Sequence, residues 1–369
     1  MMRFSAVMAL AWLPLAMAQT ATSPTSPFPA FSAHSTLVLV PAMVRTKARE
    51  LVFTLTANDF TLTDDGAEQK VTLEQDTDSE PLALVIAIET GGAGVGQLDK
   101  YGALATALDA IVGGVPHKVA VVGFDSSPRV LQNFTSDLDV AANAIHGLRP
   151  GNRGGAILDT LAFSVNLLRK QPPEYRRAIL LISETIDHGS VVKLEEALRA
   201  ISDTNTAIYS MGFSSSKSDV GREASKLSSS EPGPPGGCMS KDPSVRDSSR
   251  LAQTWECLSL LAPPLRAATI ATILGMNGVR RNVPESVAKL TGGEYFPFSS
   301  THKLETSLLI ISNHIPNRYV LSFQPRAPHP GLHSIELRLK DRPKLVVTAR
   351  RSYWADSDTM SDVGSTPHP

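Results

Sequence analysis

The chain has 369 residues, of which 42% are hydrophobic and 19% charged, so it is long enough for more than one hydrophobic core and indicates a folded, soluble protein. Its 35 Lys and Arg residues balance 36 Asp and Glu residues. This balance argues against a broad basic field for nucleic acid, so we expect no nucleic-acid partner.

Residues 1–18 have the pattern of a secretory signal peptide. Arg3 precedes the apolar run 6–15, and the small residues Ala16 and Ala18 predict cleavage after Ala18. The apolar run is shorter than the ~20 residues that span a bilayer, and no Cys follows the cleavage site to carry a lipid. We therefore expect an exported protein, periplasmic or extracellular, with no membrane span.

Residues 19–34 are rich in Ser, Thr and Pro and predict a linker. Residues 35–80 then alternate between apolar and polar side chains, which predicts strands at 36–40, 51–55, 60–63 and 70–73. Asp65-Gly66 between the last two is a hairpin-turn signal. This N-terminal segment is predicted to be a small antiparallel β unit.

From residue 81 to about residue 316, strands alternate with helices. The strands are predicted at 82–88, 118–124, 178–182 and 207–211, and the helices at 97–112, 137–147, 155–170 and 191–203. This order predicts an α/β fold with a doubly wound, mostly parallel, Rossmann-like sheet covered on both faces. The strand 82–88 is apolar throughout, as in the centre of such a sheet. It ends on Glu89 and a run of glycines, at the edge where ligands bind in open α/β sheets.

Residues 213–265 are rich in Ser, Pro and Gly and predict a long insertion. The two cysteines of the chain, Cys238 and Cys257, lie within it and are expected to form a disulfide in an oxidising compartment. A zinc site is disfavoured there because no His or second Cys pair stands nearby. Helical patterning resumes at 265–291, followed by a short strand at 292–296 and a helix at 301–314.

The C-terminal part, residues 317–354, returns to strands at 318–323, 334–339 and 344–349. We expect these strands to join the N-terminal β segment in one accessory, sandwich-like antiparallel unit. The basic pair Arg350-Arg351 is expected to be a solvated strand edge. Residues 355–369 predict a disordered tail.

The glycines after Glu89 do not predict a nucleotide site. Gly91 and Gly96 have the spacing of a phosphate-binding loop, but Gln97 and Leu98 replace the Lys and the hydroxyl that such a loop needs. Hydrolase motifs such as Gly-x-Ser-x-Gly and His-Glu-x-x-His are also missing. Asp187-His188 is the best isolated acid–base candidate, so a hydrolase is the least favoured hypothesis.

The order of elements resembles a family of bacterial secreted proteins related to the von Willebrand factor type A domain and first catalogued in acidobacteria. The resemblance covers about residues 36–354 and depends on the spacing of several short blocks. These blocks are Leu55-Thr56-Ala57-Asn58-Asp59-Phe60 with Asp64-Asp65-Gly66, Gly154-Gly155-Ala156-Ile157-Leu158-Asp159, Ile182-Ser183-Glu184, and Val347-Thr348-Ala349-Arg350-Arg351-Ser352-Tyr353.

The resemblance implies a divalent cation at the carboxyl edge of the sheet, completed by a carboxylate of a protein partner. The family motif Asp-x-Ser-x-Ser falls on Glu89, Gly91 and Ala93. A Thr of the family motif corresponds to Gly155, or to Ala156 if the register slips by one. A further Asp of the motif corresponds to Glu184, and Asp187 follows three residues later. Because Mg²⁺ demands near-octahedral oxygen ligands, the lost hydroxyls predict a degenerate site with no metal and no other cofactor, Mg²⁺ or Mn²⁺ being the alternative.

We therefore predict a non-enzymatic protein-binding or adhesion module that works without metal. Its protein partner is not identified by the sequence, and the insertion 213–265 is a candidate for part of the contact surface. The alternative is a divalent-cation-dependent adhesion module that uses Glu89 and Glu184.

Overall fold

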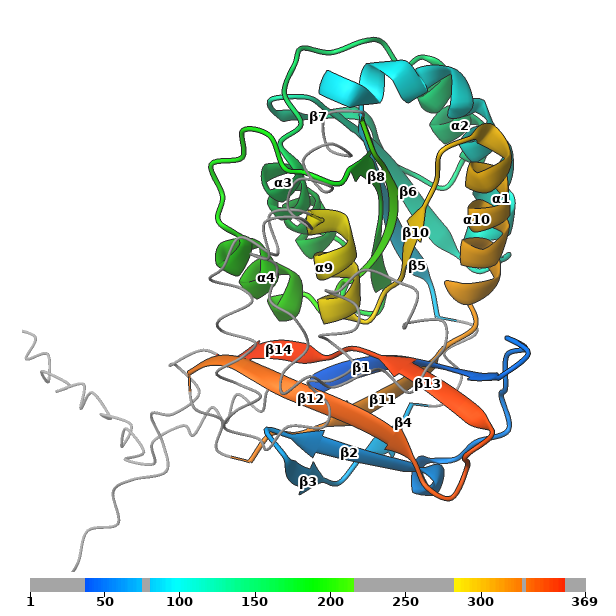
Figure 1. Ribbon diagram of the computed structural model, residues 1–369, viewed down its shortest axis with the longest axis vertical. Coiled ribbons are helices and arrows are strands. Elements are labelled where there is room, and N and C mark those ends of the chain that lie inside the picture. Colours follow the sequence, from blue (N-terminus) through cyan, green and yellow to red (C-terminus); the bar gives the residue numbers. More distant parts are fainter. Residues whose placement is uncertain (1–36, 75–79, 216–281, 327–329, 356–369) are drawn as a thin grey trace, which may run out of the picture. The chain divides into compact units, whose positions relative to one another are not determined.

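A six-stranded sheet forms the centre of the computed structural model, which describes residues 37–74, 80–215, 282–326 and 330–355 (Figure 1). All of these residues belong to one unit that begins at Ser35. The predicted signal peptide, linker, Cys238–Cys257 disulfide and C-terminal tail lie outside the described residues, as does the insertion beyond residue 215. No helix in the described ranges is long and apolar enough to cross a membrane.

The strand order of this sheet is β10-β9-β8-β5-β6-β7. β5 pairs in parallel with both β6 and β8, and among the described strands of this sheet only the edge strand β7 runs antiparallel to its neighbour. The sheet confirms the predicted α/β class with a mostly parallel sheet. Its strands are β5 (Leu82–Glu89), β6 (His117–Phe124), β7 (Pro128–Thr135), β8 (Arg176–Glu184), β9 (Ala207–Phe213) and β10 (Tyr295–Pro297).

Helices cover both faces of the sheet, because alternate side chains of the buried strands point to opposite faces (Figure 1). Leu84 and Ile86 of β5 belong to a core formed with α1 (Gly102–Val112), α2 (Leu138–His146) and α10 (Thr301–His314). Val85 and Ala87 belong to a second core on the other face. The helices of that face are α3 (Ile157–Arg169), α4 (Leu194–Asp203) and α9 (Val283–Thr291).

In the α/β part, one predicted helix is divided in the structure, and one strand of the sheet was not predicted. The predicted helix 97–112 is divided into a 3₁₀ segment, η3 (Gly92–Lys100), and α1, which begins only at Gly102. Glycines at 92, 94 and 96 explain the division, because glycine weakens a regular α-helix. β7 was not predicted, because its side chains are mostly half-buried and carry no strong apolar alternation.

Strands from the two ends of the chain form two further antiparallel sheets, with the orders β13-β1-β11-β4 and β14-β12-β2-β3. A hydrophobic core joins them, and Phe60 of one sheet meets Tyr319 of the other edge to face, at 5.5 Å between ring centroids. The strands are β1 (Val38–Thr46), β2 (Phe60–Asp64), β3 (Ala67–Gln69), β4 (Thr72–Leu73), β11 (Tyr319–Phe323), β12 (Gly331–Leu339), β13 (Leu345–Ala349) and β14 (Ser352–Ala355).

The predicted hairpin turn is confirmed, but its second strand is β3 and not the predicted strand 70–73, of which only β4 is a strand and pairs with β11. The predicted strand 51–55 is wrong. Asp65 and Gly66 connect β2 to β3 with φ values of 47° and 85°, as a type I′ turn requires. In the segment 51–55 only Leu51 forms an isolated bridge, and the amide of Leu55 donates to the hydroxyl of Tyr319 at 3.1 Å. Because the amide of Leu55 donates to a side chain, this segment does not extend the sheet. A short 3₁₀ turn, η1 (Ala57–Asp59), follows.

Arg350 is buried, which corrects the expectation of a solvated basic pair. Its guanidinium donates to the carbonyl oxygens of Ser352 (2.6 Å) and Leu39 (3.2 Å). It also donates to Ser202 Oγ (2.8 Å) at the end of α4 and to Asn205 Oδ1 (2.9 Å) in the turn after α4. Burial lowers the pKa of Arg350 to about 10, so the group stays charged at neutral pH. Arg350 thus joins the end strands to the α/β core.

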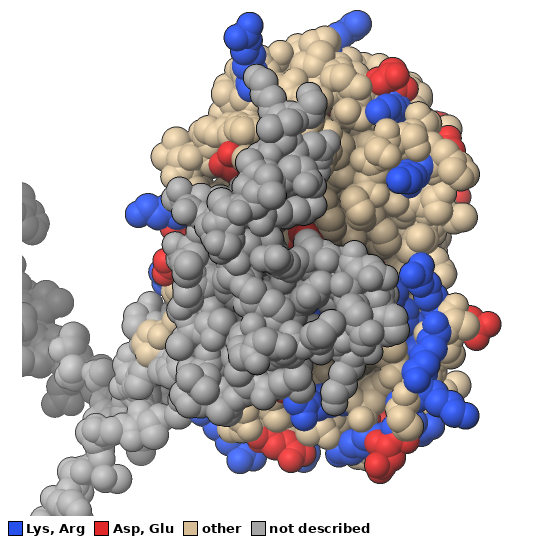
Figure 2. Space-filling view, in the orientation of Figure 1, with Lys and Arg blue, Asp and Glu red and all other residues tan. Residues whose placement is uncertain are grey.

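On the face in Figure 2, Lys and Arg side chains are interspersed with Asp and Glu side chains over the described surface. The described part of that face therefore carries charges of both signs, in agreement with the balanced composition.

Replacing Arg350 by Lys is expected to lower the free energy of unfolding by about 2 kcal/mol, because an ammonium cannot reach all four acceptors of the planar guanidinium. Urea denaturation measures this change. Arg351→Lys, at the next and partly exposed position, is the matched control, with an expected change within about 0.5 kcal/mol. Equal losses in the two variants would contradict the bridging role of Arg350.

Candidate functional site

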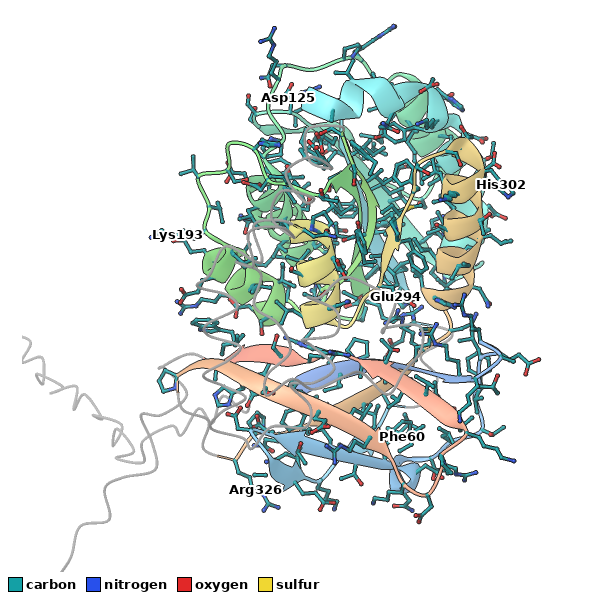
Figure 3. All side chains as sticks on the ribbon, viewed as in Figure 1. Phe60, Asp125, Lys193, Glu294, His302 and Arg326 are labelled. Carbon is teal, nitrogen blue, oxygen red and sulfur yellow. The ribbon has the colours of Figure 1, made fainter. Side chains whose placement is uncertain are left out.

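The candidate site lies at the carboxyl edge of the sheet, where β5, β6 and β8 end and their loops meet. We call this edge the rim; it comprises residues 89–101, 125–127, 150–156 and 184–193. Asp125, labelled in Figure 3, marks its position at the end of the sheet farthest from the end strands. Because parallel strands end at a common edge, the sequence-predicted residues after 88 and 182 come together here.

Glu89 is the most enclosed acid of the rim, with a relative exposure of 1%. Its Oε2 accepts a hydrogen bond from the backbone amide of Glu184 at 2.6 Å, and its Oε1 is buried without a well-formed hydrogen bond among the described residues. Burial raises the pKa of Glu89 to about 8; the charges of Glu184 and Asp187 add to the rise, whereas the amides of Glu184 and Gly94 oppose it. The Glu89 carboxyl is therefore mainly neutral at pH 7.

Glu184 is also buried, but its two oxygens have polar neighbours. Oε1 accepts from the amide (3.3 Å) and the hydroxyl of Ser215, two residues beyond β9. Oε2 lies 3.5 Å from Nε2 of His188. Glu184 thus fastens the chain that leaves β9 to the rim.

The predicted acid–base pair Asp187-His188 does not form. Asp187 Oδ1 accepts from the hydroxyl of Ser190 (2.6 Å) and from the amide of Leu158 in the first turn of α3 (3.1 Å). His188 has Glu184 as its charged neighbour, and its side chain is half exposed. The adjacent side chains therefore have different partners, and Asp187 serves to anchor the loop to α3.

The position of the first family hydroxyl, Gly91, has no room for a side chain. A Cβ atom there would lie 2.3 Å from the carbonyl oxygen of Gly154 and 2.7 Å from that of Asn152. Two backbone hydrogen bonds hold this approach, from Gly92 to Asn152 (2.8 Å) and from Gly151 to Thr90 (2.8 Å). The segment 151–155 therefore fills the space that a serine would need.

The structure places the other two predicted positions, Gly155 and Ala93, in different surroundings. Gly155 does lie at Glu89, since a Cβ at position 155 would be 3.1 Å from Glu89 Oε1. Ala93, on η3, is partly exposed and packs against the core of α1, α2 and α10. The structure thus brings Glu89, Gly91, Gly155 and Glu184 together.

An ion pair in the rim was missed by the sequence analysis. Asp125 Oδ2 accepts from Arg129 Nη1 at 2.9 Å, and Arg129 Nη2 donates to Thr90 Oγ1 at 3.1 Å. Burial would raise the pKa of Asp125, but the hydrogen bonds from Arg129 and from the amides of Asn152 and Ser127 lower it below its ordinary value. The available signal was the place of Asp125, directly after the buried strand 118–124.

The exposed part of the rim is apolar as well as polar. Val191 is 88% exposed and Val95 is 40% exposed. The loop that carries Val191 is anchored, because the amides of Val191 and Val192 donate to Asp159 Oδ1 at 2.9 and 2.8 Å. A fixed loop with an exposed aliphatic side chain is a feature of recognition surfaces.

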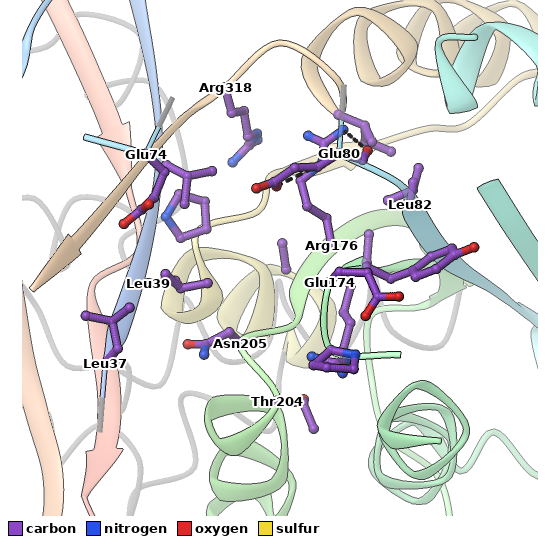
Figure 4. A pocket seen from close by; sticks show the side chains of 18 of the residues that line it. Leu37, Leu39, Glu74, Glu80, Leu82, Glu174, Arg176, Thr204, Asn205 and Arg318 are labelled. Atoms are coloured by element: carbon purple, nitrogen blue, oxygen red, sulfur yellow. Dashed lines mark hydrogen bonds and ion pairs between the residues drawn. The ribbon is translucent and has the colours of Figure 1, made fainter. Parts of the chain in front are cut away.

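A cavity of about 340 Å³ lies at the opposite, amino edge of the sheet (Figure 4). Leu39 of β1, Leu82 of β5 and the Glu80–Arg176 ion pair (3.8 Å) line part of it. Its described lining combines apolar side chains with three arginines and three glutamates. The cavity thus lies at a junction between β1 and the α/β core.

Residues 90–186 match the sequence model of the von Willebrand factor type A domain. No curated protein matches the chain.

Three similar solved structures have low identity to this chain. The von Willebrand factor domain of the type V pili tip protein Mfa5 from Porphyromonas gingivalis has 19% identity and a TM-score of 0.26, covering 30% of this chain and 39% of that chain.

Proximal thread matrix protein 1 from the mussel byssus has 12% identity and a TM-score of 0.40, covering 73% of this chain and 51% of that chain. An aerotolerance-related membrane protein from Bacteroides fragilis, with multiple mutations to serines, has 16% identity and a TM-score of 0.36, covering 63% of this chain and 98% of that chain. The chain thus spans less than two thirds of the first two. Its residues 90–186 identify it as a chain that contains a von Willebrand factor type A domain.

Proposed function

We propose that this chain is an exported, non-enzymatic protein-binding module whose rim recognises its partner without a divalent cation. The observation that carries the proposal is the filled space at Gly91, where the carbonyl oxygen of Gly154 takes the place of a metal-binding serine. In this proposal the protein is a secreted relative of von Willebrand factor type A proteins of the acidobacterial type. Its signal peptide is cleaved near Ala18, and the end strands (35–80 and 317–354) brace the α/β domain (81–316).

The chemistry of the rim supports independence from metal. A Mg²⁺ ion needs about six oxygen ligands in near-octahedral geometry, and positions 91 and 155 supply no side-chain oxygen. Glu89 is mainly protonated at neutral pH, so a cation would have to displace its proton and the amide of Glu184 as well. The residues present therefore do not fit the family's cation.

The recognition surface in this proposal is the exposed apolar part of the rim. Val95 and Val191 offer area for burial, and half-exposed His188 lies between the buried acids and solvent. A few side chains that become fully buried near the centre of an interface contribute most of its stability. The neutral Glu89 imposes no charge on the partner, so a carboxylate of the partner is not required.

The observed contacts give a hydrolase no support. The Ser190 hydroxyl donates to Asp187, and the nearest histidine in sequence, His188, has Glu184 as its charged neighbour. A serine nucleophile needs a histidine base within hydrogen-bond reach. No such relay is found among the described rim residues.

We expect titration with Mg²⁺ or Mn²⁺ to give no saturable heat by calorimetry and no rise in the melting temperature. The alternative, a cation-dependent adhesion module, predicts heat that disappears in Glu89→Ala and persists in Glu195→Ala, a change at an exposed position on α4. That pattern would refute metal independence.

The stability of the chain should fall as pH rises from about 4.5 to about 8. The folded Glu89 carboxyl keeps its proton to about pH 8, whereas the unfolded one loses it near its ordinary value of 4.5, so the folded state binds more protons in this window. The fall attributable to this group is roughly 5 kcal/mol, and the contribution of this group is flat above pH 8. Urea denaturation across this range measures it.

Glu89→Gln removes the ionisable group and keeps an oxygen for the Glu184 amide, so it should flatten this pH dependence and be more stable than the unmodified chain at pH 9. Glu195→Gln is the control and should leave the slope unchanged. An unaltered slope in Glu89→Gln would show that Glu89 is already ionised in the folded protein.

Val191→Asp should reduce capture of the partner from an extract of the native organism by about tenfold, because a charge replaces an aliphatic contact. Quantitative mass spectrometry of cross-linked complexes measures capture, with and without EDTA. Leu309→Asp is the matched control, since Leu309 is an equally aliphatic, 71% exposed residue on α10. Equal capture by Val191→Asp and the unmodified chain would contradict the rim surface, and loss of capture in EDTA would contradict metal independence.

A further inference from the structure

A second cluster of metal-capable side chains lies in the sheet β14-β12-β2-β3, away from the rim. Asp64 ends β2, Asp65 begins the hairpin turn and His333 belongs to β12. His333 Nδ1 is 2.9 Å from Asp65 Oδ2 and 3.5 Å from Asp64 Oδ1. All three atoms lie within 4.8 Å of one another, the one such group of three among the described residues.

One oxygen of the cluster lacks a hydrogen bond although it is buried. The Asp64 side chain is 9% exposed; its Oδ2 accepts from the hydroxyl of Tyr353 at 2.8 Å, whereas its Oδ1 is fully enclosed and has no hydrogen-bond donor. This Oδ1 faces His333 Nδ1 at a distance longer than a hydrogen bond. A buried carboxylate oxygen without a donor is costly unless a cation or a proton satisfies it.

The backbone fixes the orientation of all three groups. The left-handed conformation of Asp65 belongs to the type I′ turn, and its Oδ1 accepts from the amide of Ser334 at 2.9 Å, while its Oδ2 lies 2.9 Å from His333 Nδ1. The ring of His333 stacks on that of Tyr353, with centroids 4.7 Å apart and planes inclined by 21°. The three atoms are therefore positioned by strand pairing and stacking before any ligand arrives.

We propose that Asp64 Oδ1, Asp65 Oδ2 and His333 Nδ1 bind a zinc ion. Ligand atoms at about 2.0–2.2 Å from a tetrahedral zinc ion are roughly 3.3 Å apart, and the two measured separations, 2.9 and 3.5 Å, bracket this value. One imidazole and two carboxylates suit zinc, whereas Mg²⁺ and Ca²⁺ require six or more oxygen ligands.

Solvent supplies the fourth position. The Asp65 side chain is 26% exposed, whereas that of His333 is 3% exposed, so the cluster opens to water on the Asp65 side. Tyr353 is a positioning residue in this site. Its hydroxyl donates a hydrogen bond to Asp64 Oδ2 and so orients Oδ1 toward the metal, as outer-shell partners of metal ligands do. The proposal is independent of the rim and of the function proposed for it.

The test uses the full chain after treatment with a chelator, titrated with zinc chloride by calorimetry. We expect one saturable site, and Co²⁺ in its place should give the visible absorption bands of a four-coordinate ion. Asp65→Asn should weaken zinc binding by roughly tenfold or more. This variant should fold, because asparagine accepts the positive φ of the turn and keeps an oxygen for the Ser334 amide.

Tyr353→Phe gives a second readout, because it keeps the ring stacked on His333 and removes only the hydroxyl; its zinc affinity should fall by roughly 10–100-fold. His188→Gln is the matched control, since it removes the rim histidine beside Glu184 and should leave zinc binding unchanged. Absence of zinc binding in the unmodified chain overturns the proposal. So does unchanged binding in Asp65→Asn, or loss of binding in His188→Gln.

Discussion

The rim depends on the hydrogen bond between the Glu184 amide and the Glu89 carboxyl. It connects the ends of the two central parallel strands, β5 and β8, at the point where regular pairing stops. Because both partners are buried, the Glu89 carboxyl at this edge of the sheet is mainly protonated at neutral pH. The loops above it then pack as a continuation of the core, which explains why Gly91 and Gly94 can carry no side chain.

The end strands serve the α/β core through buried polar contacts. Arg350 satisfies acceptors on β1, β14 and the end of α4, and the Trp354 amide also donates to Ser202 Oγ at 2.7 Å. Such directional contacts specify one orientation of the two sheets against the core, whereas apolar burial alone tolerates several. In this arrangement the rim lies at the edge of the sheet away from the end strands.

Much of the fold could be predicted from the sequence, because long apolar runs such as 82–88 and the Asp65-Gly66 signal are local features. The strand 51–55 and the burial of Arg350 could not, since each depends on partners distant in sequence, Tyr319 and Ser202 among them. At the rim, the positions of Glu89 and Glu184 follow from strand ends. The steric block at Gly91 does not, because it comes from a loop some sixty residues away that no periodicity reveals.

The pairing of β2 with β12 has a consequence for how the protein reaches its native state. Asp65 and Ser334 are 269 residues apart, and among the described strands β1 likewise pairs with β11 and β13. β1 and one edge of β2 therefore have no native strand partner until β11–β13 have been synthesised, although β3 pairs at once with the other edge of β2. Such high contact order slows folding and exposes sticky strand edges, so chaperone protection of the nascent N-terminal segment matters more here than in a chain whose neighbours in sequence are neighbours in space.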